Sequence, residues 1–247
     1  KDKSLLAVSY FLDSYPDKTI EKIVKKSRQI VFLIQPNSKL LSRILNMIKN
    51  KKLVTILYAS SSLIYRGGIL ASKETDEIFP ITQYAMEKYK EEKILLKYAG
   101  NNHNARVVIA RLGNVYGGIK NRGLISLIFR SIIEKKELII AGDGKQIRDF
   151  VFVDDVAKSL SILLTKKFSK NIIVNIATGI GYDLIEIIKK IEKITKQKLI
   201  YHFGPSIEET LIVKCDISYL KNLIGYYPDT KINDGLQKMY KRLILAY

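Results

Sequence analysis

The sequence predicts an α/β protein with a doubly wound, Rossmann-like parallel sheet. Short apolar runs, such as residues 29–34 (QIVFLI) and 53–59 (LVTILYA), alternate with helical patterns along the chain. These runs are apolar throughout, which is typical of parallel strands that are buried on both faces. Polar side chains follow several of them, and a doubly wound sheet binds its ligands at the carboxyl ends of its strands.

The N-terminal part of the chain begins this alternation. Residues 5–11 (LLAVSYF) form the first predicted strand. Residues 17–26 have an acidic start and a basic end, which complement a helix dipole and predict a helix. After the next strand, a helix that either Asn37 or Ser38 caps extends to about residue 50. The order strand, helix, strand, helix, strand favours parallel pairing.

The rest of the chain continues in the same way. Tyr84, Lys88 and Glu92 repeat every four residues, which predicts a helix at 82–97. Asp154 and Asp155 stand where a helix begins, so helix capping explains them better than catalysis does. Gly225 closes a short helix. The other predicted strands are 105–112, 138–141, 146–153, 172–176 and 199–202, and the other predicted helices are 123–134, 155–164, 183–194, 216–223 and 232–247.

Composition limits the class of protein. The chain has 247 residues, 47% of them hydrophobic, which suffices for a large core and argues against disorder. No apolar run approaches the length of a membrane span, so we expect no membrane partner. A single cysteine, Cys215, suits a reducing compartment and a cytoplasmic location. Together with His103 and His202 it gives no metal-ligand spacing, so we expect no metal site.

The net charge of +18 raises the question of nucleic-acid binding. The lysines, however, are scattered through every segment and form no basic block beside aromatic residues. We therefore interpret the charge as a solvated cationic surface and expect no nucleic-acid partner.

One helix and the strand before it carry the candidate chemistry. Tyr84 and Lys88 are four residues apart in the predicted helix at 82–97, so both side chains can face one cleft. A phenol is a poor acid–base catalyst at neutral pH, but a neighbouring ammonium lowers its pKa towards the working range. The serines at 60–62 follow the strand at 53–59 and can present a hydroxyl to a substrate oxygen.

Simpler interpretations exist for both features. A serine cluster after a strand is equally typical of a polar turn. The Tyr-x-x-x-Lys spacing arises by chance in a lysine-rich chain with 15 tyrosines, so Tyr84 and Lys88 need support from their surroundings. Three further pairs have this spacing: Tyr89 with Lys93, Tyr116 with Lys120, and Tyr227 with Lys231.

Longer motifs supply that support, because they follow one another in order along the chain. They are ASSSLIY at 59–65, Y-x-x-x-K-x-x-x-E at 84–92, RLGNVYG at 111–117, GDGKQIRDFVFVDD at 142–155, and NIATG at 175–179 with a later segment at 216–228. This series resembles the extended short-chain dehydrogenase/reductase family, the NAD-dependent sugar epimerases and dehydratases. The resemblance covers residues 5–240.

The resemblance implies a catalytic group of Ser61, Tyr84 and Lys88 that works with NAD or NADP. Tyr84 would exchange a proton with a sugar hydroxyl, and Ser61 would hydrogen-bond the reacting oxygen. Lys88 would bind the nicotinamide ribose and lower the pKa of Tyr84. We assign Asp13, Gln35 and Lys88 to the cofactor, and Ser62, Asn114 and Arg148 to the substrate.

Four features depart from the family pattern, one of them a short connection from Gln35 to the next helix, which removes a segment that often contacts substrate. The glycine-rich phosphate loop is absent, so we expect the chain to begin near the family's third strand and to bind a dinucleotide weakly or not at all by itself. Ile34-Gln35-Pro36 stands where small residues are expected beside the cofactor. Ser206 replaces an arginine that binds phosphate, and Glu208 and Glu209 follow it. The expected substrate is therefore a nucleotide-sugar or a related sugar.

Two functions follow from these observations. The leading one is an NAD(P)-dependent epimerase or dehydratase, which by resemblance would be a homodimer. The alternative is a binding or regulatory protein that retains the fold without turnover, although it would have no need of Ser61, Tyr84 and Lys88 together. In either case we expect residues 1–116 with 150–176 to form an incomplete Rossmann-like NAD(P)-binding domain, and 117–149 with 177–247 to form a substrate-binding lobe.

Overall fold

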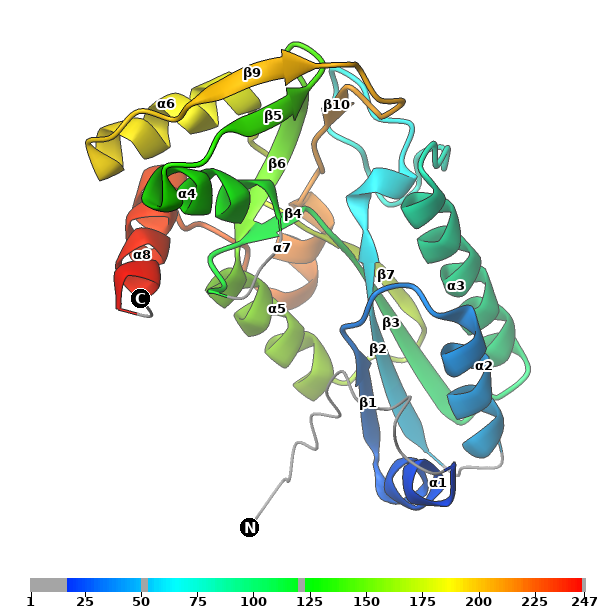
Figure 1. Ribbon diagram of the computed structural model, residues 1–247. Coiled ribbons are helices and arrows are strands. Elements are labelled where there is room, and N and C mark those ends of the chain that lie inside the picture. Colours follow the sequence, from blue (N-terminus) through cyan, green and yellow to red (C-terminus); the bar gives the residue numbers. More distant parts are fainter. Residues whose placement is uncertain (1–16, 50–52, 120–122, 246–247) are drawn as a thin grey trace.

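The computed structural model describes residues 17–49, 53–119 and 123–245. Its central element is a four-stranded sheet with the order β1-β2-β3-β7 (Figure 1). The strands are β1 (Gln29–Phe32), β2 (Val54–Ser61), β3 (Ala105–Leu112) and β7 (Ile172–Ile176). All of their pairings are parallel and helices cover both faces, so the predicted doubly wound α/β class is confirmed.

Three helices cover one face of this sheet: α1 (Asp17–Lys26), α2 (Ser38–Met47) and α3 (Gln83–Gly100). In Figure 1, α2 and α3 lie to the right of the sheet. Their apolar side chains and those of β1, β2 and β3 form one buried cluster. Asn37 caps α2 by accepting a hydrogen bond of 2.9 Å from a backbone N–H, and Thr82 caps α3 in the same way at 3.2 Å.

The opposite face is covered by α5 (Val153–Thr165) and α7 (Ser218–Ile224). The carboxylate of Asp155, in the first turn of α5, accepts hydrogen bonds from the hydroxyl of Tyr226 at 2.9 Å and from the backbone N–H of Thr230 at 3.1 Å. Asp155 thus holds the chain that follows α7, which agrees with a structural role for this residue.

The remaining elements form a second core beside the main sheet. Strand β6 (Ile147–Phe152) pairs in parallel with β4 (Asn114–Tyr116) and β10 (Ile212–Val213), and antiparallel with β8 (Gly181–Asp183). A separate parallel pair consists of β5 (Leu138–Ala141) and β9 (Tyr201–Gly204). Helices α4 (Leu124–Glu134), α6 (Leu184–Thr195) and α8 (Ile232–Ile244) pack with these strands around a buried cluster of their own.

Helix α8 approaches β4 unusually closely at Gly235. A Cβ atom added at this position would lie 2.0 Å from the hydroxyl oxygen of Tyr116 and 2.8 Å from the ring carbon that carries it. Glycine costs about 1 kcal/mol in a helix interior relative to alanine, so it is retained here for the close packing that it permits.

Within the described residues, the predicted helices and strands are present, with several shifted ends. Strand β1 ends two residues before the predicted end at 34, and β9 begins two residues after the predicted start at 199. Strand β2 extends past residue 59, because Ser60 and Ser61 are still paired with β3. The sequence does not predict β4, β8 and β10, which are only three, three and two residues long. The predicted strand at 5–11 and the predicted cofactor residue Asp13 lie outside the described residues.

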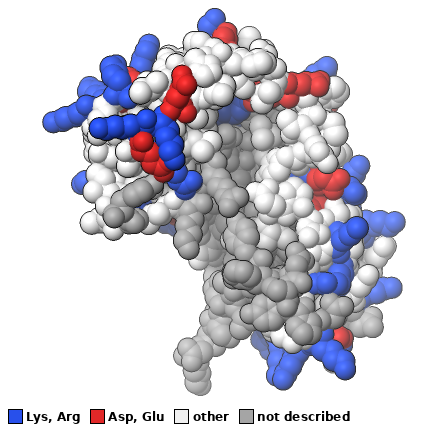
Figure 2. Space-filling view, in the orientation of Figure 1, with Lys and Arg blue, Asp and Glu red and all other residues white. Residues whose placement is uncertain are grey.

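Charged side chains of both signs lie on the face that Figure 2 shows. Figure 2 shows Lys and Arg side chains spread over the outer parts of one face, with Asp and Glu side chains between them. Within the described ranges, no helix is long and apolar enough to cross a membrane, and no three His, Cys, Asp or Glu side chains are grouped as a metal site.

Candidate active site

A cleft of about 550 Å³ lies at the carboxyl ends of β1, β2 and β3. One wall consists of Gln35 and its neighbours after β1, the end of β2, and the first turns of α3. The other wall consists of β4 and the N-terminal turn of α4. This is the edge of a doubly wound sheet where ligands bind.

Ser61 and Tyr84 face each other in this cleft. Ser61 is the last residue of β2, and its Oγ accepts a hydrogen bond of 3.2 Å from the backbone N–H of Leu63. Tyr84 is in the first turn of α3 and is 38% exposed. Burial raises the pKa of Tyr84, the hydroxyl of Ser61 lowers it, and the charge of Glu91 raises it further. In the protein alone, the pKa of Tyr84 is therefore raised. The sequence predicted the opposite, a lowering of the Tyr84 pKa by the ammonium of Lys88.

Lys88 lies one turn further along α3 and is almost fully buried. Its ammonium donates hydrogen bonds to the backbone oxygens of Ala59 at 2.8 Å and Ile34 at 3.0 Å. It also lies 4.7 Å from the ring centre of Tyr58 and 5.9 Å from that of Tyr84. Burial lowers the pKa of Lys88 to about 8, although Glu91 and Glu92 act in the opposite direction.

Two buried glutamates lie behind Lys88 on α3. Glu91 accepts a hydrogen bond of 2.6 Å from the backbone N–H of Asn37 and another from the hydroxyl of Tyr58. Glu92 accepts a hydrogen bond from Ser60 and pairs with the guanidinium of Arg111 through both carboxylate oxygens, at 3.2 and 2.9 Å. Both carboxylates are 1% exposed, so these bonds offset a large desolvation cost.

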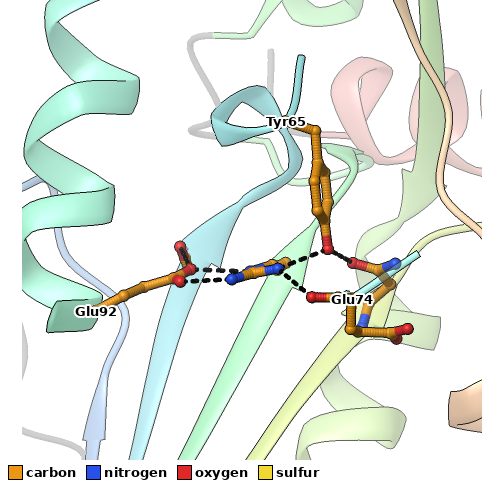
Figure 3. Close-up of polar contacts among 6 residues, drawn as sticks. Tyr65, Glu74 and Glu92 are labelled. Carbon is orange, nitrogen blue, oxygen red and sulfur yellow. Dashed lines mark hydrogen bonds and ion pairs between the residues drawn. The ribbon is translucent and has the colours of Figure 1, made fainter. Parts of the chain in front are cut away.

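Arg111 is the centre of a buried polar network (Figure 3). Glu92 lies on one side of the guanidinium, and the hydroxyl of Tyr65 and the backbone oxygen of Glu74, each at 3.0 Å, lie on the other. Tyr65 donates in turn to the side chain of Asn175 at 2.7 Å. The network joins α3 to β3 and β7 and fixes the position of the helix that carries Tyr84 and Lys88.

Of the other predicted site residues within the described ranges, two line the cleft and two lie outside its lining. Gln35 and Asn114 line it. Ser62 is outside the lining and lies buried beside the thiol of Cys215. Arg148 is also outside the lining: it pairs with Glu209 and donates to the backbone oxygens of Ile147 at 2.9 Å and Leu211 at 3.1 Å.

Sequence reasoning missed several residues of the site. Glu91 is three positions after Lys88, so its helical spacing alone was a signal that it shares the buried face. Gly123 and Ser126 line the far wall of the cleft, and no motif in the sequence pointed to them.

The cleft fits the nicotinamide half of a dinucleotide. Two of the three donors of the Lys88 ammonium are bound to backbone oxygens, and no further hydrogen bond of this ammonium is found within the described ranges, so the third can reach a ribose hydroxyl. Residues 1–66 contain no glycine, so this part of the chain holds no glycine-rich turn of the kind that binds a pyrophosphate.

The parallel sheet and the group of Ser61, Tyr84 and Lys88 in its cleft define an extended short-chain dehydrogenase/reductase fold. The chain belongs to the NAD dependent epimerase/dehydratase family, whose model matches residues 23–177.

Named relatives agree with this membership. The chain is 29% identical over 202 residues to the uncharacterized UDP-glucose epimerase YtcB of Bacillus subtilis. The matched region covers 81% of this chain and 64% of that protein. It is 32% identical over 205 residues to a putative UDP-glucose 4-epimerase of Methanocaldococcus jannaschii, covering 79% and 65%. The chain thus spans just under two thirds of the length of these curated relatives.

Solved structures show the same fold. The UDP-glucuronic acid 4-epimerase of Bacillus cereus, in complex with UDP-glucuronic acid and NAD, matches with a TM-score of 0.85 at 24% identity. The match covers 92% of this chain and 79% of that chain.

Proposed function

We propose that this chain carries the active site of an NAD-dependent enzyme that epimerises or dehydrates a nucleotide-linked sugar. The observation that carries the proposal is the meeting of Ser61, Tyr84 and Lys88 in one cleft at the carboxyl ends of the strands. Of the other pairs, Tyr89 with Lys93 and Tyr227 with Lys231 lie outside the cleft lining, and Lys120, the partner of Tyr116, lies outside the described residues. The names of the relatives support the substrate class, because they include UDP-glucose epimerases.

Each residue has a distinct part in the proposed reaction. Ser61 hydrogen-bonds the oxygen of the reacting sugar carbon and holds it next to Tyr84. Tyr84 accepts the proton of that hydroxyl group and later returns it. Lys88 binds the nicotinamide ribose, and its positive charge favours the phenolate of Tyr84. Bound NAD would supply hydride acceptance and return, and its cationic ring would further favour the phenolate.

The rest of the substrate is proposed to lie towards the second core. Asn114 lines the cleft next to α4 and is a candidate partner for the diphosphate. Ser62 and Arg148 stay predictions as substrate-binding residues, and so does the assignment of 117–149 with 177–247 to a substrate-binding lobe. Arg148 would have to exchange Glu209 for a phosphate, which is chemically reasonable because a guanidinium binds both anions.

A change of Tyr84 tests the proton-transfer role. We expect Tyr84→Phe to lower turnover by about 10²–10⁴-fold and to leave NAD affinity within about twofold, because only the acid–base group is lost. Tyr89→Phe is a matched control, since Tyr89 is on the same helix with Lys93 4.7 Å from its ring centre and is outside the cleft lining.

The measurement has two parts. Titration with NAD(H) and NADP(H) gives cofactor affinity, and a screen of UDP- and dTDP-linked sugars gives turnover. Turnover that survives Tyr84→Phe would show that another group transfers the proton.

A second candidate is a binding protein that keeps the fold without turnover. The raised pKa of Tyr84 favours it, because a phenol that stays protonated is a poor proton acceptor. A nucleotide-sugar complex without any cofactor binding or turnover would support this candidate over the enzyme.

Two broader expectations complete the proposal. We infer a homodimer by resemblance, which light scattering after size exclusion would test. We also infer a cytoplasmic location, since the single Cys215 is buried and unable to form an intrachain disulfide. Fractionation of the source cells tests this.

A further inference from the structure

We propose that Glu91 is a positioning residue for the cofactor side of the cleft. Its carboxylate ties the segment that follows β1 to the helix that carries Tyr84 and Lys88. The inference rests on the proposed function, because it assigns this segment and Lys88 to a dinucleotide. No motif used above includes Glu91.

The first observation is where the hydrogen bonds of Glu91 go. One carboxylate oxygen accepts the backbone N–H of Asn37 at 2.6 Å. Asn37 is the cap of α2 and accepts from the backbone N–H of Leu40 with its side chain at 2.9 Å. Asn37 is therefore held from both sides, by α2 and by α3.

The second observation is that Lys88 makes a hydrogen bond to the same segment as Glu91 does. The backbone oxygen of Ile34 accepts a hydrogen bond from Lys88 at 3.0 Å, three residues before Asn37. Two residues of α3, one turn apart, thus hold both ends of the short stretch formed by Gln35 and Pro36. Because Gln35 lines the cleft, Glu91 and Lys88 together determine the shape of that wall.

The third observation concerns Tyr58 of β2, which contacts both residues. Its ring centre is 4.7 Å from the Lys88 ammonium, and its hydroxyl donates to Glu91. Glu91, Tyr58 and Lys88 are all nearly inaccessible to solvent, so the negative charge of Glu91 acts on the ammonium with little screening.

The charges around Lys88 come from few groups. On α3 they are Glu91 and Glu92, and both raise the pKa of Lys88 against the effect of burial. Glu92 is paired with Arg111 of β3, which offsets much of its charge. From β2 the ammonium faces two uncharged groups, the phenol of Tyr58 and the backbone oxygen of Ala59. Loss of the Glu91 charge therefore lowers the Lys88 pKa below about 8.

Two variants separate the two contributions of Glu91. Glu91→Gln keeps an acceptor for Asn37 and removes the charge, whereas Glu91→Ala removes both. Glu87→Gln is the matched control, because Glu87 is one turn earlier on α3 and also reaches the start of α2, at 3.3 Å from the hydroxyl of Ser38, but is partly exposed.

The full chain is measured by three readouts. With Glu91→Gln we expect the titration of the Lys88 side-chain NMR signal, assigned with Lys88→Met, to move down by about one pH unit. With Glu91→Ala we expect faster hydrogen exchange of the Asn37 amide and an NAD dissociation constant about tenfold higher. Glu87→Gln should change none of these.

The outcomes distinguish this inference from its alternatives. An unchanged Lys88 titration in Glu91→Gln would overturn it, even if Glu91→Ala failed to fold. A purely structural glutamate would lower the melting temperature without moving the Lys88 titration. The Lys88 and Asn37 readouts need no bound cofactor, so they decide the role of Glu91 separately from the proposed function, even where the unsubstituted chain binds NAD weakly or not at all.

Discussion

At the scale of single residues, Lys88 shows how a buried charge is retained at a cost. The ammonium is 2% exposed and has no carboxylate in direct contact within the described residues, so two backbone oxygens and an aromatic ring replace water. Those partners stabilise the charged ammonium less well than water does. The pKa of Lys88 therefore falls to about 8. A group of this kind titrates near the working pH of an enzyme, as catalytic sites often require.

The titration of Lys88 predicts a pH dependence of stability. Its folded pKa of about 8 lies below the unfolded value of 10.5, so between these values the unfolded chain binds more protons and stability rises with pH. Compared with Lys88→Met, the unsubstituted protein should gain about 3 kcal/mol of unfolding free energy from pH 7.5 to 10.5. Urea denaturation at several pH values measures this, and parallel curves for the two proteins would contradict it.

At the scale of elements, the buried network around Arg111 connects the catalytic helix to the sheet. Removing one partner of a buried ion pair leaves the other charge uncompensated, which costs about 3–5 kcal/mol. We expect this cost for Arg111→Met in urea denaturation, and a smaller loss when Glu92→Leu is added, because no unpaired charge is then left.

An exposed pair supplies the control for this prediction. Arg66 and Glu77 are in contact at 2.8 Å, but both side chains are more than half exposed. Arg66→Met should therefore cost less than about 1 kcal/mol. Equal losses for Arg66→Met and Arg111→Met would mean that burial does not govern the strength of the Arg111 pair.

The elements also show what sequence could predict. Short, mostly apolar runs were sufficient for β2, β3 and β7, because a strand buried on both faces leaves little choice of pattern. Strands β8 and β10 could not be predicted, since their two or three residues are strands only through pairing with β6. The predicted end of β2 at residue 59 was wrong because serines do not look like strand residues, yet Ser60 is stabilised there by Glu92.

The same contrast holds for the candidate site. Helical spacing was sufficient to bring Tyr84 and Lys88 into one cleft, and the strand end brought Ser61 there. The orientation of Ser62 could not be deduced, because successive strand residues alternate between faces and the chain turns into a short helix at Ser62–Ile64. The pairing of Arg148 with Glu209 depends on the fold of the 205–211 segment, which carries no pattern of its own.

At the scale of the whole molecule, the excess of positive charge is spread over the surface around two buried cores. A net charge of +18 on a chain of 247 residues repels itself in the compact state. Because salt screens this repulsion, raising NaCl from about 0.02 to about 0.2 M should raise the melting temperature by a few degrees. A scan by differential scanning fluorimetry tests this; a melting temperature that falls with salt would indicate that specific ion pairs outweigh the net repulsion.

The close approach of Gly235 to Tyr116 has a consequence for how this protein can change over time. Tyr116 lines the cleft, while Gly235 lies on the C-terminal helix at the far side of the same side chain. A larger residue at 235 can be accommodated only if the residue at 116 becomes smaller, so the two positions are expected to covary among descendants of this chain. Selection on the cleft wall is thereby also selection on a helix outside the lining of the cleft.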